Sequence, residues 1–305
     1  MNRAQYTAGI DIGKTKISVG LFSEDAVLVD YAMKSSGNNA QEILDAVEDL
    51  LKLCIEKSKV KITGIGIASF GIVNSSLGRV VSSGVIPDWN NVPIKERMEA
   101  HFHIPTFVEN DVKAAALGEY CSLEYKKSND SLLYLSIGTS IGFAVVENSS
   151  LWHGAYQRFG EIASFRPSQN TLTLGELIGG KGIIDQYFRE TQCLKSGEEL
   201  FFMAMSGDPL ARNIYEAMIV ATAELLKWLD RCFDPEHLLV GGGVICKNKN
   251  LFHMLQAQYN TITGETRNVL TAARLREKSG VYGAAALVWQ KTMGVLPIYN
   301  RKESD

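Results

Sequence analysis

Along this chain, hydrophobic residues either form short continuous runs or recur every three to four positions. A near-continuous apolar stretch at 60–69 predicts a strand that is buried on both faces. Apolar residues at helical spacing predict helices at 39–57, at about 209–233 and at 281–293. Short apolar runs at 106–109 and 237–240 predict two further strands. No structure is expected after Ile298.

The opening stretch, 8–22, reads AGIDIGKTKISVGLF, with apolar residues on both sides of a polar turn at 11–16. This pattern predicts a strand, a turn and a second strand. The backbone amides and lysines of such a turn can bind a phosphate, and the Asp11 carboxylate can bind a magnesium ion. The alternative is a plain hairpin with no ligand.

The pattern occurs a second time at 131–147, SLLYLSIGTSIGFAVVE. Gly138 aligns with Gly13, and Ser136 aligns with Asp11, at an offset of 125 residues. A period this long is typical of a duplicated lobe and is too long for a solenoid repeat. Two such turns, one from each lobe, predict a nucleotide held between them.

The stretch at 106–120, TFVENDVKAAALGEY, places Asn110 and Asp111 between a predicted strand and an Ala-rich helix. A carboxylate at this corner can face a cleft and act on a ligand. It can also simply cap the helix by accepting hydrogen bonds from backbone amides. The sequence leaves both interpretations open.

Polar residues gather around Trp89, after the strand that ends before Gly71. An aromatic ring among amides and hydroxyls suits a carbohydrate, although ordinary turns use the same residue types. The polar residues of this group are Ser82, Ser83, Asp88, Asn90 and Asn91.

Three later segments add candidate groups. Glu161 follows a glycine in a predicted loop, and Glu176 lies near the start of a predicted helical region. The strand at 237–240 runs into Gly241, Gly242 and Gly243, whose backbone amides can face a flat or anionic ligand.

Composition narrows the functional classes. The 305 residues are 46% hydrophobic and 21% charged, enough for a full core and two lobes. The net charge of −3 gives no basic surface for nucleic acid or an anionic membrane. Without an apolar run of 18 residues or a leader pattern, the chain is expected to be cytoplasmic. The five cysteines form no CxxC pair and are expected to be ordinary buried thiols.

Five motifs in this order resemble those of the ROK family of sugar kinases and sugar-responsive repressors. They are DIGKTK at 11–16, ENDVKAAALGE at 109–119, SIGTSIG at 136–142, HGAYQRFGEI at 153–162 and LVGGGV at 239–244. The resemblance covers about residues 6–290. It implies an α/β protein with a two-lobed actin-like ATPase (ribonuclease H-like) fold, in which mixed sheets are flanked by helices.

The resemblance also implies lobes and roles. The N-terminal lobe would comprise 1–120, with the helix at about 281–293 packing back on it, and the C-terminal lobe would comprise 121–280. Asp111 matches the catalytic base. Sugar-binding positions are matched or approached by Gly71, Ser83, Asn90, Asn110, Glu161 and Glu176. Nucleotide-binding positions are matched by Gly13, Thr15, Lys16, Gly138, Thr139 and Gly241, Gly242 and Gly243, with Asp11 beside the magnesium ion. ATP and Mg²⁺ are the implied cofactors.

This sequence departs from the family pattern at several positions. Ser164 stands where the family usually has a histidine that touches the sugar and often a zinc ion, and the cysteine-rich zinc loop is replaced by RPSQNTLTLGE. Since 166–176 offers only Glu176 as a ligand, no zinc site is expected. Lys14, Ser140 and Phe143 replace glycines of the two turns and can weaken ATP binding.

The sequence therefore predicts an ATP- and magnesium-dependent kinase for the 6-hydroxyl of glucose or of the terminal glucose of a β-glucoside. The loss of the histidine and zinc loop resembles bacterial β-glucoside kinases, and a glucokinase or another hexose kinase is the alternative. A sugar-binding protein without catalysis is a third interpretation. A repressor is disfavoured because only about ten residues precede Asp11 and the chain is acidic. The expected partner is a small sugar, and the expected assembly is a homodimer.

Overall fold

The computed structural model describes residues 5–123, 130–168, 172–264 and 269–299. Its internal contacts divide the chain into two units. Unit 1 comprises Met1–Ser128, Ser149–Phe159 and Lys278–Asp305, and unit 2 comprises Asn129–Asn148 and Gly160–Glu277. The lobe boundaries given above, 1–120 and 121–280, stay a prediction, and 149–159 lies in unit 1 by this division.

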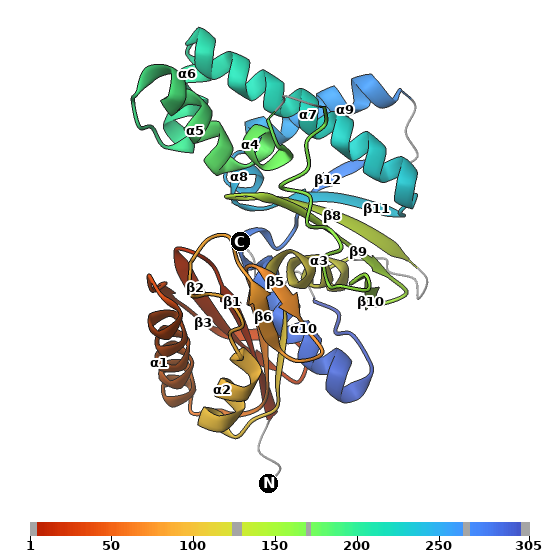
Figure 1. The fold of residues 1–305 in the computed structure, drawn as a ribbon. Helices are drawn as coiled ribbons and strands as arrows, with labels where there is room; N and C mark the ends of the chain where they lie inside the picture. Colours follow the sequence, from red (N-terminus) through yellow and green to blue (C-terminus); the bar gives the residue numbers. More distant parts are fainter. Residues whose placement is uncertain (1–4, 124–129, 169–171, 265–268, 300–305) are drawn as a thin grey trace. The chain divides into compact units, whose positions relative to one another are not determined.

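Unit 1 is built on a five-stranded sheet (Figure 1). Its strand order is β3 (Leu28–Ser35), β2 (Lys16–Ser23), β1 (Gln5–Ile12), β4 (Lys61–Ser69) and β7 (Thr106–Asn110). β1 and β2 pair antiparallel, which confirms the predicted hairpin, while β4 runs parallel to both β1 and β7. The carboxyl ends of β4 and β7 therefore meet at one edge, where Ser69 pairs with Asn110.

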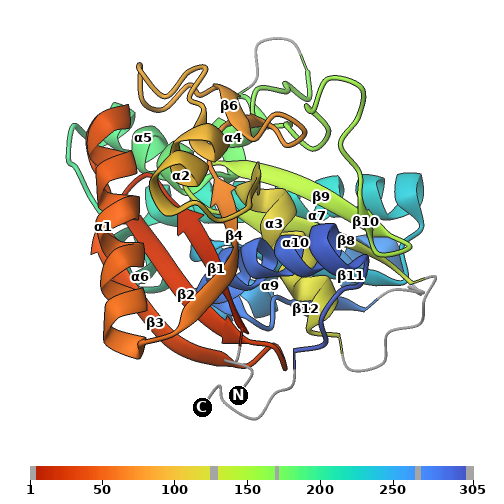
Figure 2. The ribbon, with the colours of Figure 1, turned by 90° about the horizontal axis from the view of Figure 1, so that it is seen from below.

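The two faces of this sheet carry side chains of different size. On one face isoleucines of β1 and β4, such as Ile10 and Ile67, pack into the core with apolar residues of α1 (Ala40–Ser58). On the other face β1 and β4 present Gly9, Gly64 and Gly66 to α10 (Ser279–Met293), which lies on that side of the sheet (Figure 2). A Cβ atom on Gly66 would lie 1.7 Å from the Ala284 carbonyl oxygen, so only glycine permits this approach.

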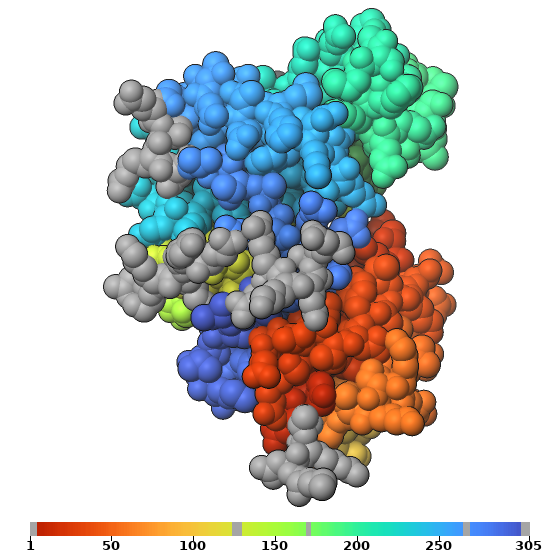
Figure 3. Space-filling view, turned by 180° about the vertical axis from the view of Figure 1, so that it is seen from behind, coloured from red at the N-terminus to blue at the C-terminus, as the bar shows by residue number. Residues whose placement is uncertain are grey.

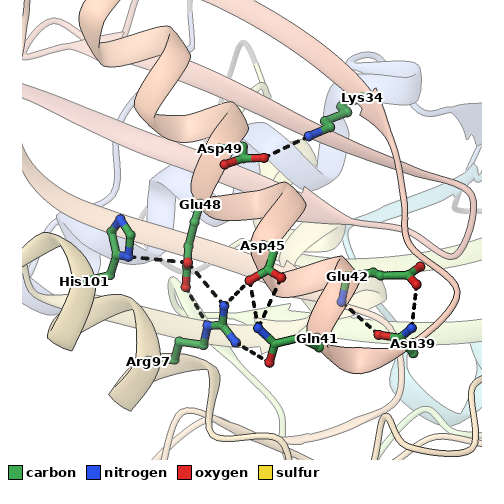
Figure 4. Close-up of polar contacts among 9 residues, drawn as sticks. All are labelled: Lys34, Asn39, Gln41, Glu42, Asp45, Glu48, Asp49, Arg97 and His101. Atoms are coloured by element: carbon green, nitrogen blue, oxygen red, sulfur yellow. Dashed lines mark hydrogen bonds and ion pairs between the residues drawn. The ribbon is translucent and has the colours of Figure 1, made fainter.

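A partly buried ion network joins α1 to α2 (Ile94–Phe102), as Figure 4 shows. The Arg97 guanidinium donates through Nε to Glu48 Oε1 at 2.6 Å and through Nη1 to Gln41 Oε1 at 3.0 Å. The hydrogen bonds to the Glu48 and Asp45 carboxylates raise the pKa of Arg97, and His101 approaches the same Glu48 carboxylate at 3.4 Å. The network fixes α2 to α1 on this side of the sheet.

The rest of unit 1 comprises α3 (Asp111–Cys121), a small hairpin of β5 (Ile72–Asn74) and β6 (Arg79–Ser82), and the two-residue β10 (Ser150–Leu151). The expectation that nothing after Ile298 is ordered is wrong for Tyr299. The Tyr299 ring is buried and packs against Phe22 and Tyr282. Its hydroxyl donates a hydrogen bond to the Tyr282 carbonyl at 2.6 Å. An aromatic cluster thus holds the C-terminal segment to unit 1.

Unit 2 has its own mixed sheet, in which four strands follow the order β9 (Ile141–Glu147), β8 (Ser131–Ile137), β11 (His237–Gly241) and β12 (Leu270–Ala272). The helices of unit 2 are α4 (Leu174–Ile178), α5 (Gly180–Thr191), α6 (Gly197–Met205), α7 (Pro209–Phe233), α8 (Gly243–Cys246) and α9 (Lys249–Thr263), with the 3₁₀ turn η1 (Arg276–Lys278) at its end. The α5 and α6 segment (green) and α9 (blue) both reach the surface of this unit (Figure 3).

The second sheet repeats the arrangement of the first. β8 and β9 form an antiparallel hairpin, and β11 runs parallel to β8 and to β12. This is the same order and direction as in β2, β1, β4 and β7. The internal repeat that the sequence predicts from Gly13 and Gly138 is therefore confirmed in the topology.

Candidate active site

The corner between β7 and α3 holds Asp111. Thr106, Phe107 and Val108 favour the strand, and the alanines that follow favour the helix. Asn110 has extended backbone angles (φ −62°, ψ 144°), and its side-chain oxygen accepts from the Lys113 amide at 3.1 Å. Asn110 is thus the N-cap. Asp111 is the first residue of the helix and also accepts a backbone hydrogen bond there, so its predicted catalytic role and a role at the helix start both stay open.

Two donors fix the Asp111 carboxylate. Its Oδ1 accepts from the Val112 amide at 2.9 Å and from Asn110 Nδ2 at 3.0 Å. The side chain is half-buried and lies in the first turn of α3, where the helix dipole favours a negative charge. This arrangement orients the carboxylate, as a general base requires.

Three side chains around Asp111 hold neighbouring loops. Asn110 Nδ2 also donates to the Gly71 carbonyl at 3.0 Å, Glu109 Oε2 pairs with His153 Nε2 at 2.7 Å, and Lys113 Nζ donates to the Gln157 carbonyl at 3.1 Å. The Glu109 and Lys113 side chains are 2% and 1% exposed. A buried charge is costly unless it is paired, so these contacts constrain both loops strongly.

Sequence analysis missed Glu109, Lys113 and His153 as site residues. The partners are 44 residues apart in the chain, so no local spacing indicates the contacts. One signal was present. A glutamate at the end of an apolar strand and a lysine on an otherwise alanine-rich face both indicate charges that need buried partners.

The predicted sugar-binding residues of unit 1 lie together. Gly71 has φ 96°, and a Cβ atom there would lie 3.3 Å from Ser83 Cβ, so the two residues are in contact range. The Ser83 amide donates to Asn90 Oδ1 at 2.9 Å. With the bond from Asn110 to Gly71, these residues form one continuous group at the amino end of α3.

Trp89 does not provide a surface for a sugar. It is fully buried, stacks on Phe70 with ring centroids 5.3 Å apart, and its Nε1 donates to Ser69 Oγ at 3.3 Å. Asp88 accepts from the Ala40 amide, and Asn91 accepts from Arg79. The polar residues around Trp89 therefore include ordinary loop contacts, as the alternative interpretation held.

Asp11 lies at the end of β1 against the start of α10. A Cβ atom on Gly280 would come within 2.7 Å of the Asp11 carboxyl, so the glycine leaves space for that group. Burial raises the pKa of Asp11 from 3.8 to about 6, and the positive charge of Lys16 acts in the opposite direction. The Gly13 amide closes the turn by donating to the Lys16 carbonyl at 3.0 Å, and Lys14 and Thr15 are exposed on it.

The turn of the second hairpin is tied to α5 within unit 2. The Gly138 carbonyl accepts from the Gly180 amide at 2.9 Å, and the Thr139 carbonyl accepts from the Lys181 amide at 3.1 Å. The Thr139 side chain is exposed.

The three consecutive glycines differ in their surroundings. A side chain on Gly241 would collide with the Tyr134 hydroxyl, and one on Gly242, at φ 86°, would collide with the backbone of Ile137. Gly243 has no atom within 4 Å of a Cβ position among the described residues. Gly242 therefore lies against the strand that leads into the Gly138 turn, and Gly243 leaves open space beside it.

Glu161 and Glu176 belong to adjoining parts of unit 2. Glu161 is exposed after Gly160, whose carbonyl accepts from the Phe143 and Ile162 amides, and Ala163 accepts from the Gly175 amide. Glu176 closes a capping box with Thr173 and forms an ion pair with Arg189. Hydrogen bonds from Thr173 lower the pKa of Glu176. Glu176 therefore has a structural role that the sequence analysis did not predict.

Phe143 does not point at the turn it follows. Its side chain is buried and contacts Phe233 at the end of α7, with ring centroids 5.6 Å apart. Ser140 is exposed in the turn, and its carbonyl accepts from the Gly138 amide at 2.9 Å. Of the three departures from glycine, Lys14 and Ser140 therefore present side chains at the turns.

The described residues contain no cluster of three or more His, Cys, Asp and Glu that could hold a metal ion. Residues 169–171 of the replaced zinc loop lie outside the described residues, so the expected lack of zinc stays a prediction. The cysteines were expected to be buried, which is correct for Cys54 and Cys121 but wrong for Cys193 and Cys232, which are exposed. Within the described part of the chain, no helix is long and apolar enough to cross a membrane.

Comparison with known proteins places this geometry in a family. The model described as "ROK family" matches residues 7–291. The chain is 26% identical to a glucokinase of Streptomyces coelicolor over 92% of this chain and 96% of that protein. It is also 26% identical to a β-glucoside kinase of Listeria monocytogenes, over 91% and 95%.

The structure is similar to that of a ROK hexokinase from Thermus thermophilus, with a TM-score of 0.80 and 25% identity over 95% of this chain and all of that one. The two units are therefore the lobes of an actin-like ATPase fold, each with a mixed sheet flanked by helices, as the sequence predicts.

Proposed function

Because this chain belongs to the ROK family and is a carbohydrate kinase, we propose that it transfers the γ-phosphoryl group of ATP to the 6-hydroxyl of glucose or of the terminal glucose of a β-glucoside. The oriented carboxylate of Asp111 carries this proposal. Two hydrogen bonds hold its Oδ1, and neighbouring residues of α3 and β7 anchor two loops beside it. Asp111 accepts the hydroxyl proton, a role that contributes a factor of about 10²–10⁴ to rate.

The hairpin turns are the proposed nucleotide contacts. Gly13, Thr15 and Lys16 would bind phosphate from unit 1, and Gly138, Thr139 and Gly241 to Gly243 would bind nucleotide from unit 2. A half-buried carboxylate facing a glycine fits Mg²⁺, which is commonly held by one or two carboxylates and the substrate phosphates. Asp11 would hold this ion, which when bound neutralises charge on the transferred group.

The sugar would contact Gly71, Ser83, Asn90 and Asn110 of unit 1, with Glu161 and Glu176 as further candidates from unit 2. The hydrogen bonds from the Ser83 amide to Asn90 and from Asn110 to the Gly71 carbonyl support the first group. Loss of a charged hydrogen-bond partner in such a site costs about 1.5–3 kcal/mol. A Glu161→Ala variant should therefore show its effect mainly in KM.

Ser164 is one residue that bears on the choice between glucose and a β-glucoside. This side chain is exposed and smaller than the histidine usual in the family, so it leaves more room for an aglycone. We propose that cellobiose or gentiobiose is phosphorylated with kcat/KM at least comparable to that for glucose. Ser164→His should shift the ratio toward glucose.

A coupled assay of ADP release tests the proposal over glucose, mannose, fructose, N-acetylated hexosamines, cellobiose and gentiobiose. Activity should require Mg²⁺ and stop when magnesium is removed, while elemental analysis should find no bound zinc. A wild-type preference for glucose of a hundredfold or more, about 2.7 kcal/mol, would favour a zinc-free glucokinase. Sugar binding without turnover would instead identify a binding protein.

We also propose that the protein is a homodimer and that it is cytoplasmic, as expected from the sequence. Light scattering of the purified protein at micromolar concentration tests the first, with twice the 33.6 kDa chain mass expected.

A further inference from the structure

A hollow lies in unit 1 between the β5–β6 hairpin and the segment at 155–158; we call it the hairpin hollow. Its volume, about 830 Å³, is within the ~300–1,000 Å³ of typical small-molecule sites. The hairpin contributes Ile72, Leu77 and Val81, and the segment contributes Tyr156, Gln157 and Arg158. None of these residues was among the sugar or nucleotide contacts proposed above.

The walls combine apolar and hydrogen-bonding groups. The Tyr156 side chain is 84% exposed, and Leu77 and Val81 are 58% and 44% exposed, so the protein itself does not cover these surfaces. Arg158 is exposed, and the described residues provide no hydrogen bond or ion pair to it. A pyranose ring has an apolar face that packs on an aromatic ring and hydroxyl pairs that accept from a guanidinium group.

Both walls of the hollow are fixed to the start of α3. On the hairpin side, Ile72 follows Gly71, whose carbonyl accepts from Asn110. On the other side, the Gln157 carbonyl accepts from the buried Lys113, and Gln157 Oε1 accepts from Ser75 Oγ at 3.2 Å. Gln157 is held at φ 62°, an uncommon conformation that these contacts maintain. The hollow is therefore preformed and adjoins the residues beside Asp111.

We propose that the hairpin hollow binds the second pyranose ring of a β-linked diglucoside whose terminal glucose is phosphorylated at Asp111. This inference rests on the proposed kinase function and deepens it, because it names the surface that recognises the aglycone. Tyr156 packs on the ring face, and Arg158 donates to ring hydroxyls. The neutral sugar is favoured over an anionic ligand because a single cation faces mainly apolar groups in the hollow.

The test compares kcat/KM of wild type and Tyr156→Ala for cellobiose, gentiobiose and glucose. The variant should lose at least tenfold on its preferred diglucoside and less than twofold on glucose, which has no second ring. Arg158→Gln should lose three- to tenfold on the diglucoside alone. Phe202→Ala removes an aromatic ring that is 71% exposed on α6 in unit 2, and it is the matched control. It should leave kcat/KM unchanged for glucose and for the diglucosides.

Equal losses on glucose and diglucosides, or no loss on either, would overturn the inference. So would a wild-type enzyme that phosphorylates glucose but neither diglucoside, although the kinase proposal would then stand. If wild type phosphorylates no sugar in the presence of ATP and magnesium, the kinase proposal fails and this inference fails with it. A selective loss on acidic glucosides in Arg158→Gln, with neutral diglucosides unaffected, would assign the hollow to an anionic aglycone and also overturn it.

Discussion

At the scale of single residues, burial of the Asp11 carboxylate lowers the stability of the folded protein when this group is ionised. Its folded-state pKa of about 6 lies above the ordinary value of 3.8. Native protein therefore binds this proton more tightly than unfolded protein does, and the free energy of unfolding falls as pH rises from 3.8 to 6. Above pH 6 the ionised carboxylate costs the fold about 3 kcal/mol, from one shift of roughly two pKa units.

The Asp11→Asn variant tests this cost. Because the amide cannot ionise, the variant should be more stable than wild type at pH 7, by up to about 3 kcal/mol, and the difference should shrink toward pH 4. Chemical unfolding of both proteins between pH 4 and pH 8, without metal or nucleotide, measures it. A variant less stable than wild type at pH 7 would show that the carboxylate is favourably paired.

Some of the site residues could be predicted from the sequence, and others could not. The family resemblance predicts that Gly71, Asn110 and Asp111 share one site, and the hydrogen bond from Asn110 to Gly71 does bring them together. The role of Trp89 stayed open, since nothing in the local sequence tells a buried indole from an exposed one. The contacts of Glu109 and Lys113 could not be predicted. Each partner lies 44 residues away in the chain, and only tertiary packing brings the two groups together.

At the scale of elements, α3 and α10 pack unusually closely. A Cβ atom on Gly283 would lie 1.6 Å from the Ala114 carbonyl oxygen, and one on Gly118 would lie 2.6 Å from the Ser279 carbonyl oxygen. Ser279 Oγ also donates to the buried Glu119 at 2.6 Å. These contacts join the helix that carries Asp111 to the helix that faces Asp11.

Gly283→Ala tests the importance of this packing. The obstructing atoms belong to backbone, so the helices must separate, which costs about 1–3 kcal/mol or more. Thermal unfolding should show a lower Tm, and kcat should fall because Asp111 moves. Gly197→Ala is the control, since no atom lies within 4 Å of its Cβ position among the described residues and alanine suits the first turn of α6. Equal Tm values for the two variants would contradict the account.

Elements were more predictable than contacts. The bounds of α7, 209–233, and of the two hairpins follow from periodicity, because a long amphipathic stripe or a turn between apolar runs has few alternatives. The packing of α10 on the first sheet was expected only from the family resemblance. Its physical cause, the alternation of glycine and isoleucine in β1 and β4, was present in the sequence but becomes meaningful only beside a helix.

At the scale of the whole molecule, the two units carry complementary chemistry. Unit 1 holds Asp111, the group from Gly71 to Asn90, and the Asp11 turn, while unit 2 holds the Gly138 turn, the consecutive glycines, Glu161 and Glu176. The duplicated hairpin explains why each unit has a turn that we propose binds phosphate. In the sequence, only the first copy has an acid two positions before the glycine. Among the described residues, the strand-to-helix corner with a carboxylate and an Ala-rich helix lies in unit 1.

Turnover by Asp111→Asn is the most direct test of the central claim that Asp111 is the base of a sugar kinase. Asparagine keeps the size of the side chain and an oxygen for the Val112 amide but is a far weaker base. With the preferred sugar, ATP and magnesium at saturation, kcat should fall by about 10²–10⁴. Sugar affinity, measured calorimetrically, should stay within about tenfold, because loss of a base acts on the transition state. A variant that keeps more than about a tenth of wild-type kcat would show that Asp111 serves the start of α3 and not the reaction.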